Sequence, residues 1–174
     1  MTLKIGVLMA AWLLLAAVFA TRARLRRHVQ RRSRTSLIGM AIQGVALALV
    51  CVPHRTSSGD NQVLWLAAPI LAGAVWLMAA AVTTLGRQWS LAAEIQTHHA
   101  LITSGPYAFV RHPIYVGTLG MLIGTGLIMT TTMTLGGAVL IYLAGTWIRV
   151  SEEERLLAAA FGEEYVAYKK RTRF

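Results

Sequence analysis

Charged residues are scarce in this sequence. They make up 14% of its 174 residues, and the mean hydropathy is +0.56. A soluble domain of this size carries about 25% charged residues, which it needs to solvate its surface. The composition therefore excludes an ordinary soluble protein. It predicts a membrane protein with a single domain over residues 1–174.

Cysteine is almost absent, and several cofactor and catalytic patterns are missing. Cys51 is the one cysteine, so neither an internal disulfide nor a cysteine-based zinc site can form. We expect it to be a small buried hydrophobic residue. The histidines lack paired ligand spacing, so no metal site is expected. The chain also has no Rossmann fingerprint, P-loop, HExxH or GxSxG pattern.

Acidic residues are few, seven against 17 basic ones, which gives a net charge of +10. Seven of the basic residues lie between Arg22 and Arg34, flanked by apolar runs and without interleaved aromatics. Such a cluster sets membrane topology and meets anionic lipid headgroups. We therefore expect contact with membrane lipid and no binding of nucleic acid.

Five apolar runs can be recognised along the chain. They are Ile5–Ala20, Leu37–Pro53, Val63–Leu85, Ile114 to about Met129 and about Leu135–Ile148. Because lipid cannot satisfy exposed backbone groups, these runs predict an all-α fold with about five transmembrane helices. The short connection at Thr130–Thr134 predicts that the last two form a helical hairpin. The first run also resembles a signal peptide, but the arginines that follow it resist export and favour a retained helix.

The basic residues predict the topology. If the Arg22–Arg34 loop is cytoplasmic, residues 86–113 and 149–174 fall on the same side, which then holds 15 of the 17 basic residues. We expect an integral protein, of a bacterial inner membrane, with an external N-terminus. Its long polar segments would then face the cytoplasm.

Two polar segments contain the charged and aromatic residues that could bind a ligand or catalyse a reaction. Residues 86–113 are too apolar for a solvated linker, yet they contain charged residues and histidines and end in Arg111-His112-Pro113. One interpretation is a simple membrane-entry boundary with a snorkelling arginine. In residues 149–174, Leu157, Phe161, Tyr165 and Tyr168 recur at helical spacing and predict a cytosolic amphipathic helix.

Glu152–Glu154 follow the fifth run and have two interpretations. They can start a new helix, since acids are favourable at a helix N-terminus. Alternatively, beside Arg149 and opposite Arg111-His112, they can line a polar pocket under the membrane surface. Such a pocket suits a zwitterionic, cationic ligand, and S-adenosylmethionine has the matching groups.

The two segments together resemble the isoprenylcysteine carboxyl methyltransferase family. The first part of the match is His99-Ala100-Leu101, Gly105-Pro106-Tyr107 and an RHPxYxG pattern at residues 111–117. The second part is an RxxxEExxL…FGxxYxxY pattern at residues 149–168. The resemblance covers residues 86–174, the expected cofactor-binding half, and residues 1–85 show no such match.

The resemblance implies a membrane methyltransferase that uses S-adenosyl-L-methionine. It assigns to the cofactor site a set of residues from both segments: His99, Tyr107, His112, Tyr115, Glu153 and Glu154. It places Arg111 and Arg149 at or near the reacting centre, as the catalytic candidates. It also implies a second opening towards lipid that admits the acceptor.

The resemblance leaves the methyl acceptor open. A lipophilic or small molecule could accept on a carboxylate, which needs no general base, or on a thiol or amine, which must lose a proton. Two other functions stay open from the residues. One is a membrane reductase on a related helical scaffold, and the other is a non-catalytic lipid-binding subunit.

Overall fold

The computed structural model describes residues 2–23, 29–53, 62–89, 94–96 and 100–172. Its helices are α1 (Thr2–Ala23), α2 (Arg34–Cys51), α3 (Gln62–Leu85), α4 (Pro113–Met129), α5 (Thr132–Phe161) and α6 (Glu163–Arg171). Two 3₁₀ turns are η1 (Gly86–Gln88) and η2 (Gly105–Ala108). Each of the five apolar runs coincides with one of the helices α1–α5, so the expected helical membrane fold is confirmed.

Two short strands were not expected from the sequence. β1 (Val29–Arg32) pairs antiparallel with β2 (Glu94–Gln96), with Val29 opposite Gln96 and Arg32 opposite Glu94. Both segments are short, and β1 stands one residue before the start of α2. Their pairing depends on how the helices place them in the fold, and the local sequence does not predict that placement.

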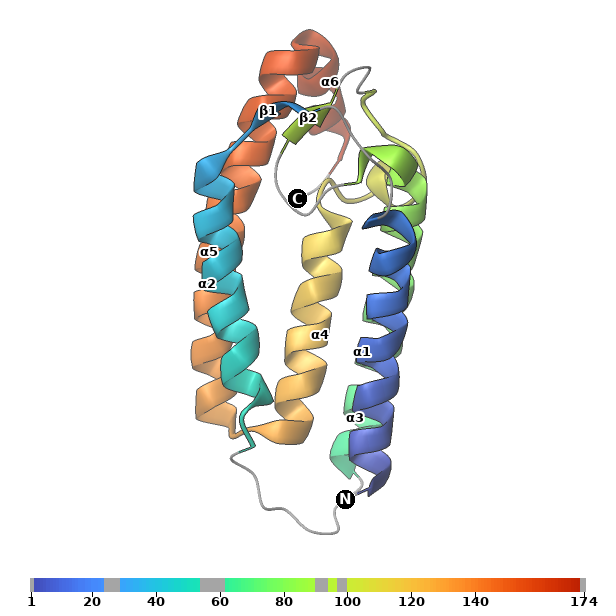
Figure 1. The fold of residues 1–174 in the computed structure, drawn as a ribbon, viewed down its shortest axis with the longest axis vertical. Coiled ribbons are helices and arrows are strands. Elements are labelled where there is room, and N and C mark those ends of the chain that lie inside the picture. Colours follow the sequence, from blue (N-terminus) through green and yellow to red (C-terminus); the bar gives the residue numbers. More distant parts are fainter. Residues whose placement is uncertain (1, 24–28, 54–61, 90–93, 97–99, 173–174) are drawn as a thin grey trace.

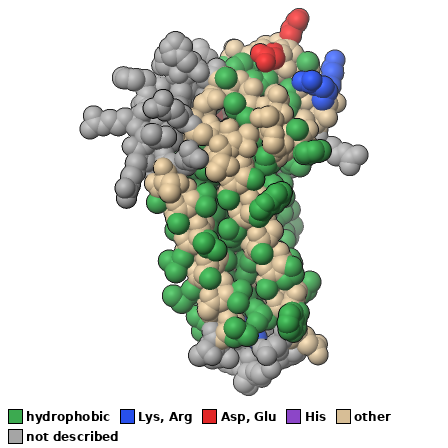
Figure 2. Space-filling view, turned by 90° about the vertical axis from the view of Figure 1, so that its right-hand side faces the viewer, with side chains coloured by type: hydrophobic (Ala, Val, Ile, Leu, Met, Phe, Trp, Pro, Cys, Tyr) green, Lys and Arg blue, Asp and Glu red, His purple; other side chains and the backbone are tan. Residues whose placement is uncertain are grey.

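Within the described residues, four helices are long and apolar enough to cross a membrane, namely α1, α2, α3 and α5, and α4 is a shorter apolar helix. Hydrophobic side chains cover the long body of the molecule on the face shown in Figure 2, while the charged ones gather at one end. α5 has 30 residues and therefore measures about 45 Å, more than a hydrocarbon core of about 30 Å. The chain is an integral membrane protein.

The helices form two groups joined by α4 (Figure 1). α1 and α4 pack on α3, and their core contains Leu15, Leu71 and Met121. α2 packs on α5 and on α4, around Val50, Leu122 and Tyr142. Trp12 of α1 also donates from Nε1 to Oγ1 of Thr125 in α4, at 3.2 Å. α1 is thus packed against α3 and α4.

The connection between α4 and α5 is short, and it confirms the predicted hairpin. Only Thr130 and Thr131 separate the two helices. The Thr131 side chain caps α5 by accepting from the backbone N–H of Thr134 at 3.3 Å. The hairpin leads α5 back to the end of the molecule where β1, β2 and α6 lie (Figure 1).

The end of α5 differs from one interpretation of the sequence. The helix continues through Glu152–Glu154 and ends only at Phe161, so these acids do not start a new helix. The chain turns at Gly162, whose φ of +52° favours glycine, and α6 then begins. Leu157 and Tyr165 therefore lie on different helices. A second expectation is also corrected, because Cys51, at the end of α2, is exposed on the protein surface.

Candidate functional site

A cavity of about 310 Å³ lies at the charged end of the bundle. Small-molecule sites usually have volumes of about 300–1,000 Å³. One part of its wall is polar and is formed by Tyr107, Arg111, His112, Tyr115, Arg149 and Glu153. Another part is apolar and is formed by Phe19, Met40, Leu47, Leu85, Trp89 and Ile114. The cavity thus draws side chains from helices α1 to α5, and Tyr168 of α6 adds to its wall.

The segment before α4 is shaped by glycine and proline. Gly105 has a φ of +59°, and a Cβ at this position would lie 2.8 Å from Oγ1 of Thr84 in α3. Pro106 is the second residue of the 3₁₀ turn η2, and Pro113 starts α4 where its missing N–H costs nothing. These two turns hold the backbone against the end of α3 and α4. They direct Tyr107 and His112 into the cavity wall, where both are buried.

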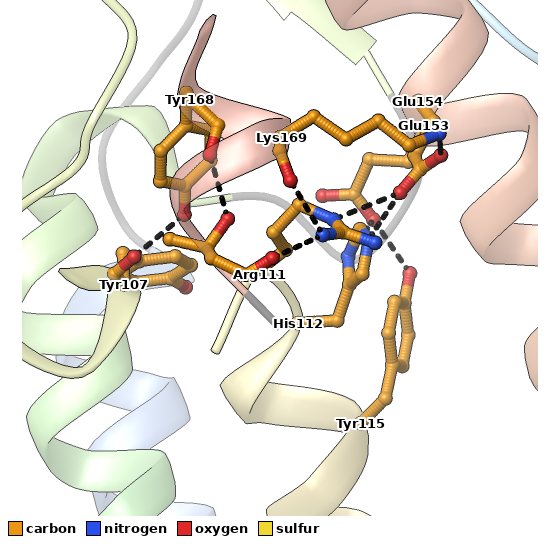
Figure 3. Close-up of polar contacts among 9 residues, drawn as sticks. Tyr107, Arg111, His112, Tyr115, Glu153, Glu154, Tyr168 and Lys169 are labelled. Atoms are coloured by element: carbon orange, nitrogen blue, oxygen red, sulfur yellow. Dashed lines mark hydrogen bonds and ion pairs between the residues drawn. The ribbon is translucent and has the colours of Figure 1, made fainter. Parts of the chain in front are cut away.

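Arg111 lines the cavity but directs its donors to the C-terminal helix and an acid. Its Nε donates to Oε1 of Glu154 at 3.1 Å. One Nη donates to the carbonyl oxygens of Lys169 at 3.3 Å and Thr172 at 2.7 Å (Figure 3). Free carbonyls at a helix C-terminus carry partial negative charge, so a guanidinium stabilises them. Arg111 therefore fastens the end of α6 to α5.

Glu154 is surrounded by cationic and hydrogen-bonding side chains. Besides Arg111, the His112 Nε2 lies 3.4 Å from its Oε1, and Lys169 Nζ forms an ion pair with its Oε2. Figure 3 shows these groups meeting between α5, α6 and the start of α4. Glu154 is not among the residues that line the cavity. In this structure it ties together the elements that surround the cavity.

Glu153 points the other way and does line the cavity. Its Oε2 accepts from the Tyr115 hydroxyl at 2.9 Å, and His112 Nδ1 lies 3.9 Å from the same oxygen. Its side chain keeps 38% exposure, against 16% for Glu154. Two adjacent acids of one sequence pattern thus take different places, one at the cavity and one in the ion cluster.

Two buried tyrosines close the cavity next to α6. The Tyr168 hydroxyl donates to the Tyr107 carbonyl oxygen at 2.7 Å. Burial raises the pKa of both phenols, and the negative charge of Glu153 raises the pKa of Tyr107 further. Both hydroxyls therefore stay protonated at neutral pH. They can donate hydrogen bonds but cannot serve as bases.

Arg149 lies on the cavity side of α5. Its guanidinium carbon is 5.0 Å from the centre of the Tyr115 ring, a cation–π distance. Its Nη1 donates to Oε1 of Gln43 at 2.9 Å. Gln43 is a further cavity residue, which was not expected from the sequence. The signal was present, since Gln43 is the one amide side chain within the apolar run 37–53.

Most of the expected site residues meet at this cavity. Tyr107, Arg111, His112, Tyr115, Arg149 and Glu153 line it, and Glu154 borders it through Arg111 and His112. His99 lies outside the described residues. Among the residues that the structure describes, no group of three or more metal-ligating side chains is found.

The chain is similar to a known protein family and to several curated proteins. The model of the "Isoprenylcysteine carboxyl methyltransferase (ICMT) family" matches residues 65–159. The chain is 37% identical over 120 residues to the protein-S-isoprenylcysteine O-methyltransferase of Mus musculus, covering 64% of this chain and 41% of that protein. The corresponding Xenopus laevis protein is 35% identical over 121 residues, 64% of this chain and 40% of that protein.

A bacterial protein with a different name is also similar. The cobalt-zinc-cadmium resistance protein CzcN of Cupriavidus metallidurans is 34% identical over 98 residues, 55% of this chain and 44% of that protein. The chain thus matches about two fifths of the length of these curated relatives.

Proposed function

Because this chain belongs to the isoprenylcysteine carboxyl methyltransferase family, we propose that it transfers a methyl group from S-adenosyl-L-methionine to a lipophilic acceptor at the membrane. The observation that carries the proposal is the two-part wall of one cavity. Its polar part holds a carboxylate, guanidinium groups, tyrosines and a histidine, while its apolar part extends between α1 and α2. A charged cofactor and a lipophilic acceptor can therefore bind in the same cavity.

The polar part of the cavity fits the chemical groups of S-adenosylmethionine. Glu153, whose side chain keeps 38% exposure, suits an ammonium or ribose hydroxyls. The ring face of Tyr107 suits a sulfonium, and Tyr115 contributes to the cofactor site through its hydroxyl, which donates to Glu153. His112 completes the described candidates for this site, with His99 as a further candidate from the sequence. We propose that Glu154 supports the cofactor indirectly, by holding His112 and Arg111 in place.

The protein supplies alignment and a dry site. When bound, S-adenosylmethionine supplies a methyl carbon whose bond to sulfur breaks as the bond to the acceptor atom forms, and the electron pair goes to sulfur. Arg149, which lines the cavity, can hold an anionic acceptor group for attack on that carbon. Arg111 is the second candidate, although its donors face α6 and Glu154. Tyr168 and Trp89 help to exclude water.

The acceptor is proposed to be membrane-borne and to enter from the lipid. The apolar part of the wall includes Phe19 of α1 and Met40 and Leu47 of α2. The basic residues support a cytoplasmic position for the cavity, as 15 of 17 fall on its side of the predicted topology. We propose a bacterial inner membrane as the location.

Calorimetry on the detergent-purified protein tests the proposal against the two other functions. S-adenosylmethionine and S-adenosylhomocysteine should both bind at one site, whereas NADPH should not. Binding of NADPH alone would favour a reductase. Binding of none of the three would contradict an enzyme of either kind and favour a lipid-binding subunit.

A further inference from the structure

Gln43 occupies an unusual place for a polar side chain. It lies in the second half of the apolar helix α2, is only 5% exposed, and borders the cavity. An amide is expensive to bury in a membrane helix unless its hydrogen bonds are satisfied. Both ends of this amide are bonded to α5: Oε1 accepts from Arg149 at 2.9 Å, and Nε2 donates to Thr146 Oγ1 at 2.7 Å.

The chemistry of the partners fixes which end of the amide faces which residue. A guanidinium can only donate, so the Gln43 oxygen must face Arg149. The nitrogen then faces the Thr146 hydroxyl, which is itself buried and can accept. The Gln43 side chain therefore has one productive orientation, and that orientation presents an acceptor to Arg149.

Two glycines bring α2 and α5 close enough for this contact. A Cβ at Gly39 would lie 2.7 Å from the Gly145 carbonyl oxygen and 2.6 Å from Cγ of Arg149. A Cβ at Gly145 would lie 2.7 Å from the Gly39 carbonyl oxygen and 3.0 Å from the Gln43 backbone nitrogen. Small residues allow such close crossings of membrane helices. The crossing leaves space for the Arg149 stem directly beside Gln43.

Arg149 is thereby held on two sides. Gln43 binds its Nη1, and the Tyr115 ring lies 5.0 Å from its guanidinium carbon. The Tyr115 hydroxyl in turn donates to Glu153 at 2.9 Å. A continuous series of contacts thus runs from the lipid-embedded helix α2 to the carboxylate at the polar part of the cavity.

We propose that Gln43 is a positioning residue for methyl transfer: it orients the Arg149 guanidinium towards the reacting group of the acceptor. The inference rests on the proposed function, and it assigns a role to a residue outside the part of the chain that the family model matches, residues 65–159. Gln43 acts through Arg149. Its hydrogen bonds go to Arg149 and Thr146, and not to Glu153, the carboxylate proposed to bind the cofactor. Its loss should therefore affect turnover more than cofactor affinity.

Gln43→Leu tests this role, with Thr125→Val as the matched control. Thr125 is equally buried and accepts one interhelical hydrogen bond, from Trp12, but it does not line the cavity. Turnover of Gln43→Leu should fall roughly ten- to hundredfold, since a misdirected catalytic group costs that much. The dissociation constant for S-adenosylmethionine should change less than about threefold, and Thr125→Val should keep its turnover.

Two kinetic outcomes would overturn the proposal. One is equal turnover in Gln43→Leu and Thr125→Val. The other is a loss of cofactor affinity as large as the loss of turnover, which would make Gln43 a binding or packing residue. Arg149→Lys already loses the planar guanidinium that Gln43 orients, so adding Gln43→Leu to it should lower turnover little further. If the two substitutions instead lower turnover independently, so that their effects multiply in the double variant, the proposal is also contradicted.

A second readout needs no activity and separates this inference from the proposed function. In protein labelled with ¹⁵N-arginine, a held guanidinium rotates slowly and gives separate Nη signals, which Arg149→Lys identifies by their loss. Gln43→Leu should merge these signals. Gln43→Glu, which keeps an oxygen acceptor, should retain them. If the wild type binds no S-adenosylmethionine, the proposed function fails, while this measurement still decides whether Gln43 holds the Arg149 guanidinium. Signals that stay separate in Gln43→Leu would overturn that contact and the positioning role with it.

Discussion

Neighbouring residues of one sequence pattern have different surroundings in this site. Glu153 faces the cavity and binds Tyr115, whereas Glu154 faces away from it and meets Arg111, His112 and Lys169. Consecutive positions on a helix lie about 100° apart, so one residue of an adjacent pair can reach the cavity while the other reaches α6. The pattern identifies both acids, but only the position of α6 separates their roles.

Glu153→Gln should weaken S-adenosylmethionine binding by roughly ten- to a hundredfold. The reason is the loss of a charge-assisted hydrogen bond to the ligand, worth about 1.5–3 kcal/mol. Glu163→Gln is the matched control, because Glu163 is exposed on α6 and lies away from the cavity. Calorimetry on both variants measures the difference. Equal affinities would remove Glu153 from the cofactor site.

Arg111→Lys should loosen α6. The planar guanidinium of Arg111 binds Glu154 and the carbonyls of Lys169 and Thr172 at the same time. Lysine keeps the charge but cannot make all of these contacts together. Turnover should fall about tenfold or more, with a smaller change in cofactor affinity. Hydrogen exchange of residues 163–171 should become faster in parallel. A fall in turnover without faster exchange would instead show that Arg111 acts on the acceptor directly.

At the scale of whole elements, α2 determines the space available to the acceptor. Gly44 borders the cavity, and a Cβ at this position would meet no atom within 4 Å. Gly44→Leu should therefore fold normally and fill the apolar part of the cavity. We expect the KM for a long-chain acceptor to rise at least tenfold, with cofactor affinity unchanged.

Gly73→Leu is the control for this prediction. Gly73 of α3 is equally open and lies away from the cavity, so its replacement adds the same bulk to a lipid-facing helix. Its KM for the acceptor should equal that of the wild type. Parallel changes in the two variants would show that α2 does not border the acceptor's path.

The elements themselves could be predicted well, because membrane helices appear directly as apolar runs. The α4–α5 hairpin could also be predicted, because the short segment Thr130–Thr134 can connect the two helices only as antiparallel neighbours. The break at Gly162 could not be predicted, because a glycine in a helical pattern is compatible with a continuous helix. The antiparallel pairing of Val29–Arg32 with Glu94–Gln96 depends on tertiary placement and has no local signal.

The topology of the whole molecule can be tested by cysteine labelling, with Cys51 replaced by alanine. A cysteine introduced at Ser57 or Ser58, which lie outside the described residues, should react with an impermeant reagent added to intact cells. Cysteines at Ser104 or Glu164, both exposed at the charged end, should react only after lysis. The reason is the uneven distribution of basic residues. Labelling of Ser104 from outside would reverse the predicted orientation.

The site could be predicted where chemistry and pattern coincide, as at His112, Tyr115 and Glu153. It could not be predicted where distant helices meet. Gln43 bonds Arg149 across 106 positions of sequence, through a crossing that depends on two small residues. Likewise, the ion pair between Lys169 and Glu154 could not be predicted. It forms because the turn at Gly162 brings α6 back over α5, and the sequence does not predict that turn.

Transfer of a labelled methyl group tests the central claim most directly. Membranes containing the protein are incubated with S-adenosylmethionine carrying a radioactive methyl group, and the organic and aqueous phases are then counted. Wild-type membranes should place label in the organic phase, in molecules absent from vector controls, and Glu153→Gln should reduce the label at least tenfold while Glu163→Gln should not. Label in the organic phase equal to that of vector controls would contradict the account.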